Sequence, residues 1–202
     1  MILALDTSTA ACTAALLTNG GEVIGTRDEL IGRGHAERLM PMVAELLENR
    51  RPERILVGVG PGSFTGIRVG IAAAHGMGIG WGVEVNGMSS LALLASAARA
   101  DGPVAAAIAG GHGEVFVQQF GASLEPESVL LNLPPAEAAA AIDAQLVVGT
   151  GAAALVEARG WGEARECWPS ADNALGLPLS LRSLVPAPVY ARAPDARVKS
   201  AA

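Results

Sequence analysis

The order of apolar and polar positions divides the first half of the chain into short apolar runs and longer helical segments. Apolar runs of four to eight residues between turn residues are typical of strands. Here they predict strands at residues 2–5, 11–17, 22–30, 55–59 and 83–87. Helices are predicted at about residues 35–49, 66–80 and 89–100. The pair Asn19-Gly20 indicates a hairpin between the second and third strands.

A related pattern follows residue 101. Strands are predicted at residues 104–109, 114–120, 128–133 and 145–149, and helices at residues 134–142 and 151–159. The order βββαβα therefore occurs twice. This repetition predicts an α/β protein with an actin-like fold of two ribonuclease-H-like lobes. We place the first lobe at residues 1–101 and a smaller second lobe at residues 102–202, whose proline-rich, extended tail should lie over an earlier part of the chain.

Composition narrows the class of protein. The 202 residues are 50% hydrophobic, yet they contain no apolar run of the roughly 18 residues that a membrane span needs. Because the N-terminus has no basic region or export signal, we expect a cytoplasmic protein without a membrane. Cys12 and Cys167 should be reduced. The net charge of −6 and the seven aromatic residues disfavour a protein that holds nucleic acid alone.

The segment GVGPGSFTGIRVG, residues 58–70, looks like a phosphate-binding loop. A P-loop needs a lysine where this chain has Ile67, and the spacing G-x-G-x-x-x-G is one residue longer than the dinucleotide-binding pattern. We therefore favour a structural turn, in which Ser63 or Thr65 caps the next helix. Anion binding at the start of that helix remains an alternative.

The two helices around this loop have unusual surfaces. Small residues recur every fourth position in the second helix, which allows another backbone to approach closely, either that of the chain's own sheet or that of a partner helix. The first helix has an apolar arc of about 200°, wider than the roughly 100° that one core requires. Pro41 either kinks this helix or places its regular start near residue 40. We predict a helix-mediated interface lined or supported by Leu39, Met40, Val43, Leu47, Gly66, Gly70, Ala74 and Gly78.

Candidate chemistry is sparse. The three histidines are far apart and there is no Cys-x-x-Cys, so we expect no metal site. Asp6, Thr7 and Ser8 follow the first strand, where actin-like ATPases hold hydrated magnesium, but the matching hairpin at residues 107–115 has no carboxylate before Glu114. Asp6 can instead be a turn former. The alternative function is a small actin-like ATPase that uses Asp6 and the 110–113 loop.

Several segments together resemble the TsaB family, which is also named YeaZ. They are spread over nearly the whole chain: ILALDTST, GHAERLMPMVAELL, GVGPGSFTGIRVGIAAAHGMGIG, NGMSSLALLA, GEVFVQQF and PVYARAPDA. The second half matches more loosely, because Ala109, Gly110 and Gly111 stand where many relatives have Asp-Ala-Arg.

The resemblance implies an actin-like fold and a part in making threonylcarbamoyladenosine beside the anticodon of transfer RNAs that read codons beginning with A. It implies a non-catalytic partner and activator of TsaD, which pairs with TsaD through helices of the first lobe and can form a homodimer through much the same surface. ATP and metal are then expected on the partner subunits, TsaE completes the complex, and tRNA is bound only through the complex. The older name glycoprotease finds no support in these residues.

Overall fold

A computed structural model describes residues 1–98 and 100–190. Its first sheet has the strand order β3-β2-β1-β4-β5. The first three strands form an antiparallel meander, and β4 and β5 run parallel to β1. Their bounds are β1 Ile2–Asp6, β2 Ala11–Leu17, β3 Val23–Leu30, β4 Arg54–Gly58 and β5 Glu84–Met88.

The second sheet repeats this topology with the order β10-β9-β6-β7-β8. Strands β6, β7 and β8 form its meander, and β9 and β10 are the parallel strands. Their bounds are β6 Val104–Ala109, β7 Val115–Phe120, β8 Leu131–Leu133, β9 Leu146–Val148 and β10 Glu163–Arg165. The repeated mixed sheet confirms the predicted actin-like fold class; β10 is a strand that the pattern did not predict.

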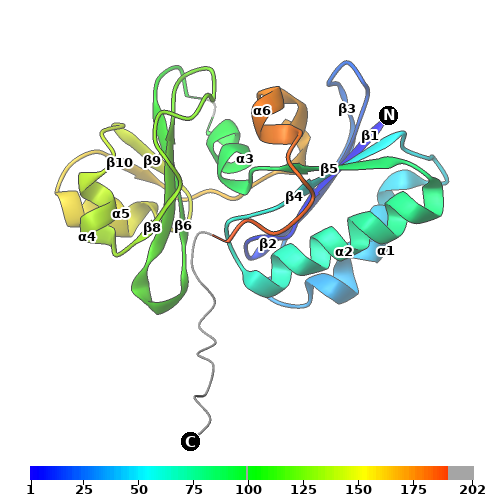
Figure 1. The fold of residues 1–202 in the computed structure, drawn as a ribbon, viewed down its shortest axis with the longest axis horizontal. Coiled ribbons are helices and arrows are strands. Elements are labelled where there is room, and N and C mark those ends of the chain that lie inside the picture. The colour runs from blue at the N-terminus through cyan, green and yellow to red at the C-terminus, as the bar shows by residue number, and fades with distance from the viewer. Residues whose placement is uncertain (99, 191–202) are drawn as a thin grey trace, which may run out of the picture.

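Helices cover both faces of the first sheet (Figure 1). One face carries α1 and α2, which lie side by side and share a core with Leu3 and Leu5 of β1. The alternate residues Ile2 and Ala4 face the core around α3. Among these helices α1 begins at residue 35 and continues through Pro41, so the predicted alternative start near residue 40 is wrong. Their bounds are α1 His35–Leu47, α2 Phe64–Trp81 and α3 Ser90–Ala97.

The second sheet is covered by two shorter helices, α4 Pro135–Ala140 and α5 Ala152–Arg159. The chain then returns to the first sheet through the 3₁₀ helix η2, Ala171–Gly176, and the short helix α6, Leu179–Arg182. Gly87 of β5 and Leu184 exchange backbone hydrogen bonds of 2.7 and 3.0 Å. The predicted boundary at residues 101 and 102 falls between the two sheets, while the segment after β10 packs on the first sheet.

Both cysteines are free thiols, and burial raises the pKa of Cys12 to about 11. Among the described residues, no helix combines the length and the apolar character needed to cross a bilayer.

Candidate functional site

A cleft of about 930 Å³ separates the two sheets at the carboxyl ends of β1 and β4. Its walls come from the polar turn after β1, the start of α1, the glycine loop before α2, and the residues around the 110–113 loop of the second sheet. This is the position where the sequence placed Asp6 and its possible magnesium chemistry. The chemistry of the cleft therefore depends on whether Asp6 is available.

Asp6 is fully buried and already bound on both carboxylate oxygens. Its Oδ1 accepts hydrogen bonds from the Ser8 amide at 2.7 Å and from the Ser8 hydroxyl at 2.6 Å. Its Oδ2 accepts one from the Ser90 hydroxyl at 2.6 Å. Burial raises the pKa of this carboxyl, although the hydroxyl hydrogen bonds act in the opposite direction. The arrangement is that of a turn former, and it does not fit a carboxylate that holds a hydrated metal ion.

Further hydrogen bonds tie the polar turn after β1 and the start of α3 to the glycine loop. The Gly60 amide donates to the Ser90 hydroxyl at 3.2 Å, and the Ser63 amide donates to the Ser8 carbonyl oxygen at 2.7 Å. The Thr7 hydroxyl donates to the Gly66 carbonyl oxygen at 2.7 Å. Thr7 and Ser8 therefore hold the loop against the sheet, and neither hydroxyl is directed at a ligand by these contacts.

The glycine loop is shaped by this close packing. A Cβ atom on Gly62 would lie 2.1 Å from the Ser8 carbonyl oxygen, and one on Gly66 would lie 2.0 Å from the Thr7 carbonyl oxygen. Gly62 also has a φ of 152°, a conformation that favours glycine. Ser63 caps α2 by accepting a hydrogen bond from the Gly66 amide at 3.3 Å, which confirms its predicted role. The glycines of this loop are therefore required because the loop packs closely against the chain's own backbone.

The opposite wall of the cleft is the hairpin around residues 110–113. Residues Gly111–Gly113 form a short 3₁₀ turn, and Gly110 closes the hairpin by donating to the Glu114 carbonyl oxygen at 2.8 Å. The side chain of Glu114 accepts a hydrogen bond from the Asn132 amide at 2.7 Å. Within the described part of the chain no cluster of metal-ligating side chains is found.

The predicted interface residues divide into one exposed residue and seven buried ones. Met40 is 46% exposed, whereas Leu39, Val43 and Leu47 are buried in the core beneath α1. The small-residue ridge of α2 also faces inward: a Cβ on Gly70 would lie 2.5 Å from Thr7 Oγ1, and one on Gly78 would lie 2.6 Å from Val85 Cγ2. Gly66 and Ala74 are buried on the same face. The inference that this ridge receives a partner helix is wrong, because the chain's own sheet fills it.

A second row of small residues runs along the outer face of α2. Ala72, Gly76 and Gly80 are exposed, and no atom lies within 4 Å of a Cβ built on either glycine. Ile79 on this face is 84% exposed. On the neighbouring α1, the residues Ala36, Met40 and Ala44 are exposed at every fourth position. We call these two rows the outer helical surface; its members are Ala36, Met40, Ala44, Ala72, Gly76, Ile79 and Gly80.

An aromatic cluster stands at the beginning of α2. The rings of Phe64 and Tyr190 stack with centroids 5.4 Å apart, and the Arg68 guanidinium lies 3.7 Å from the centre of the Phe64 ring. Arg68 Nε also donates to the Tyr190 hydroxyl at 3.0 Å. This cluster could not be predicted from the sequence, since its members are separated by up to 126 positions. The tail segment PVY was the only local signal.

The family model that matches this chain and two of its curated relatives are named for the threonylcarbamoyl modification of tRNA. The model of the TsaD family, tRNA N6-adenosine threonylcarbamoyltransferase, matches residues 21–143. The chain is 42% identical over 102 residues to the tRNA threonylcarbamoyladenosine biosynthesis protein TsaB of Haemophilus influenzae, covering 48% of this chain and 42% of that protein. It is 38% identical over 127 residues to the Escherichia coli protein of the same name, covering 59% and 54%. The chain thus spans about half the length of these two relatives.

Solved structures match over nearly the entire chain. The structure of YeaZ from Pseudomonas aeruginosa is 32% identical, with a TM-score of 0.79, and the match covers 94% of this chain and 98% of that one. The ethanolamine utilization protein EutJ from Carboxydothermus hydrogenoformans has a TM-score of 0.50 at 14% identity, with 87% and 88% covered. At this identity EutJ shows a likeness of fold alone.

Proposed function

Because the chain belongs to the TsaB family, also named YeaZ, we propose that it takes part in forming threonylcarbamoyladenosine in tRNA. We propose further that it is a non-catalytic partner that activates a TsaD protein. In this proposal TsaD pairs with the first lobe, TsaE joins the complex, and tRNA is bound through the complex. ATP and metal then belong to the partner subunits.

The outer helical surface carries the proposal of a protein partner. It exposes small and apolar side chains on two adjacent helices, and Ile79 near the end of α2 is 84% exposed. The alanines and glycines of the two rows let a second pair of helices approach closely. The flexible side chain of Met40 can adapt to the side chains of those helices. The same surface is available for a homodimer, which would compete with TsaD.

The engagement of Asp6 supports a non-catalytic role. An ATPase of this fold would need a carboxylate free to hold hydrated magnesium at the end of β1, whereas Asp6 accepts three hydrogen bonds from Ser8 and Ser90. Calorimetry of the isolated chain with magnesium and ATP tests the point. Tight binding with turnover that is lost in Asp6→Ala would contradict the proposed role and favour the ATPase.

The substitution Ala72→Arg tests the interface. Ala72 is exposed at the middle of α2, so the larger charged side chain should leave the fold intact and block a partner helix. We expect the affinity for TsaD from the same organism to fall at least tenfold, corresponding to about 1.4 kcal/mol. Light scattering of the mixed proteins measures the complex, and modification of tRNA in a reconstituted reaction measures activation.

Ala153→Arg is the matched control, because Ala153 is an exposed helical alanine on α5 of the second sheet. It should retain both the complex and activation. Equal binding by the two variants, with both folded, would place the TsaD contact elsewhere. Gly70 and Ala74 are unsuitable positions for this test, since both are buried against the chain's own sheet.

A further inference from the structure

A second pocket lies at the opposite end of the first sheet from the cleft. Its volume is about 650 Å³. It is enclosed by the β2–β3 hairpin at residues 19–21, by the start of β1 and β4, and by η2 and α6 of the returning segment. In Figure 1 the N-terminus and α6 both lie on the side of this sheet away from α1 and α2. The nucleotide position of the actin-like fold is the interlobe cleft, so this pocket is a separate feature.

Strand register places an arginine on the inner wall of this pocket. Arg54 pairs with Ile2 in the parallel β1–β4 ladder, and paired residues of neighbouring strands point to the same face. Ile2 faces the core that contains η2. Arg54 is therefore directed to the face where α6 supplies Arg182, and both side chains line the pocket.

The unused hydrogen-bonding capacity of the pocket consists mainly of donors. Glu53 accepts from the N-terminal ammonium group on Oε1 at 3.0 Å and from Asn19 on Oε2 at 3.1 Å. Asp172 accepts from the neighbouring Asn173. In contrast, within residues 1–98 and 100–190 no hydrogen bond or ion pair engages the side chain of Arg54, and the terminal nitrogens of Arg182 are equally unengaged. Among the described residues, the carboxylates of Glu53 and Asp172 therefore accept hydrogen bonds, whereas the guanidinium groups of Arg54 and Arg182 keep N–H donors that no partner uses.

The side chain of Arg182 is fixed by one hydrogen bond. Its Nε donates to the carbonyl oxygen of Leu177 at 2.8 Å, and Leu177 is buried. This contact fixes the side chain while it leaves both terminal nitrogens directed elsewhere. A guanidinium fork that is already ordered loses less side-chain entropy when it binds a planar or tetrahedral oxyanion.

From these observations we propose that the pocket binds the phosphate group of a small molecule of about nucleotide size. Two guanidinium groups supply paired N–H donors, the geometry that suits phosphate. The volume lies within the roughly 300–1,000 Å³ of small-molecule sites. A small ligand is favoured over an RNA backbone because Glu53 and Asp172 at the walls, with a net charge of −6, would repel an extended polyanion. The inference does not depend on the proposed function.

Titration of the isotope-labelled full chain with inorganic phosphate and with AMP tests the proposal by nuclear magnetic resonance. The amide signals of Gly20, Gly21 and Gly176 should shift in a saturable manner, since these residues line the pocket. Arg54→Ala and Arg182→Ala should each weaken the affinity for AMP at least tenfold. Arg51→Ala is the matched control. Arg51 is an exposed arginine in the segment just before β4, and it does not line the pocket, so its variant should bind like the wild type.

Three results would overturn the proposal. The first is an absence of saturable shifts with either probe in the folded wild type. The second is shifts that map to the interlobe cleft around Ser63 and Gly66 and are unaffected by Arg54→Ala. The third is binding of tRNA, but of neither phosphate nor AMP, that is lost in both arginine variants, because that pattern assigns the two arginines to RNA. Loss of TsaD pairing in Ala72→Arg, with AMP binding retained, would separate this site from the proposed interface.

Discussion

The environment of Asp6 determines what this residue can do. An aspartate at the end of the first strand looks like a magnesium ligand in the sequence alone, yet its carboxylate is buried and receives three hydrogen bonds from within the chain. A buried carboxylate favours its neutral form, and the pKa of Asp6 is raised accordingly. Its principal contribution is to join β1, the glycine loop and α3 through Ser8 and Ser90.

Asp6→Asn should therefore change how stability depends on pH. Because the folded-state pKa lies above the ordinary value of 3.8, the folded chain keeps this proton at pH values where the unfolded chain has released it. The free energy of unfolding of the wild type, relative to that of the variant, should fall as the pH rises above about 4. Urea denaturation between about pH 4 and 7 measures this difference.

The exposed substitution Asp101→Asn serves as the control for general effects of removing a carboxylate. A wild-type advantage over Asp6→Asn that grows with pH would show that the hydrogen bonds outweigh burial, and would contradict the stated direction.

At the level of the element, α2 has glycines on both its inner and its outer face, and the surroundings of the two groups differ. Its inner glycines permit contact with the turn after β1, whereas Gly76 on the outer face has no neighbour within 4 Å of an added Cβ. Glycine within a helix costs about 0.8–1.0 kcal/mol relative to alanine. The inner glycines are required by packing, and the outer ones are tolerated at that cost to keep the surface flat.

Two alanine substitutions in α2 should thus have opposite effects. Gly76→Ala should raise the free energy of unfolding by about 0.5–1 kcal/mol through helix propensity. Gly66→Ala should lower it by about 1–3 kcal/mol, because the new methyl group would lie 2.0 Å from the Thr7 carbonyl oxygen and force the backbone apart. Chemical denaturation of both variants measures the changes. Similar values for the two would mean that contacts of the inner face do not determine the choice of glycine.

The helix α2 also shows which features of the fold could be predicted from the sequence. Apolar periodicity located the strands β1–β9, the helices α1–α5 and the repeated order, because each of these depends on local spacing, but it did not locate β10. It grouped Gly66, Gly70, Ala74 and Gly78 on one face but could not decide whether that face meets the sheet, since α2 has small or apolar residues on all sides. The contact of Phe64 with Tyr190 depends on the path of the returning segment. The arginine pair of the second pocket depends on it as well.

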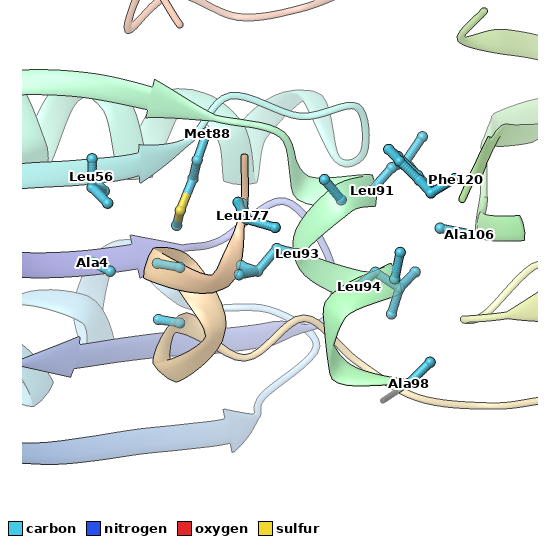
Figure 2. Packing of buried hydrophobic residues seen from close by; sticks show 14 of the residues in the cluster. Ala4, Leu56, Met88, Leu91, Leu93, Leu94, Ala98, Ala106, Phe120 and Leu177 are labelled. Carbon is cyan, nitrogen blue, oxygen red and sulfur yellow. The ribbon is translucent and has the colours of Figure 1, made fainter. Parts of the chain in front are cut away.

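At the scale of the whole molecule, α3 joins the two sheets into one core. Figure 2 shows its leucines between Leu56 and Met88 of the first sheet on one side and Ala106 and Phe120 of the second sheet on the other. Leu177 of the returning segment fills the same cluster. A continuous core of this kind opposes rotation of one lobe against the other.

Leu94→Ala tests whether the lobes unfold as one unit. Leu94 is 1% exposed and reaches toward Gly149 of the second sheet from a helix that also packs on the first. Its truncation should lower the free energy of unfolding by about 2–5 kcal/mol. Because the core is shared, amide hydrogen exchange should lose the same protection in β1 as in β6. Leu179→Ala removes the same atoms from a side chain that is 64% exposed, and should leave protection in both strands nearly unchanged. If Leu94→Ala lowered protection in β6 alone, the two lobes would unfold as independent bodies, and the shared core around α3 would not couple them.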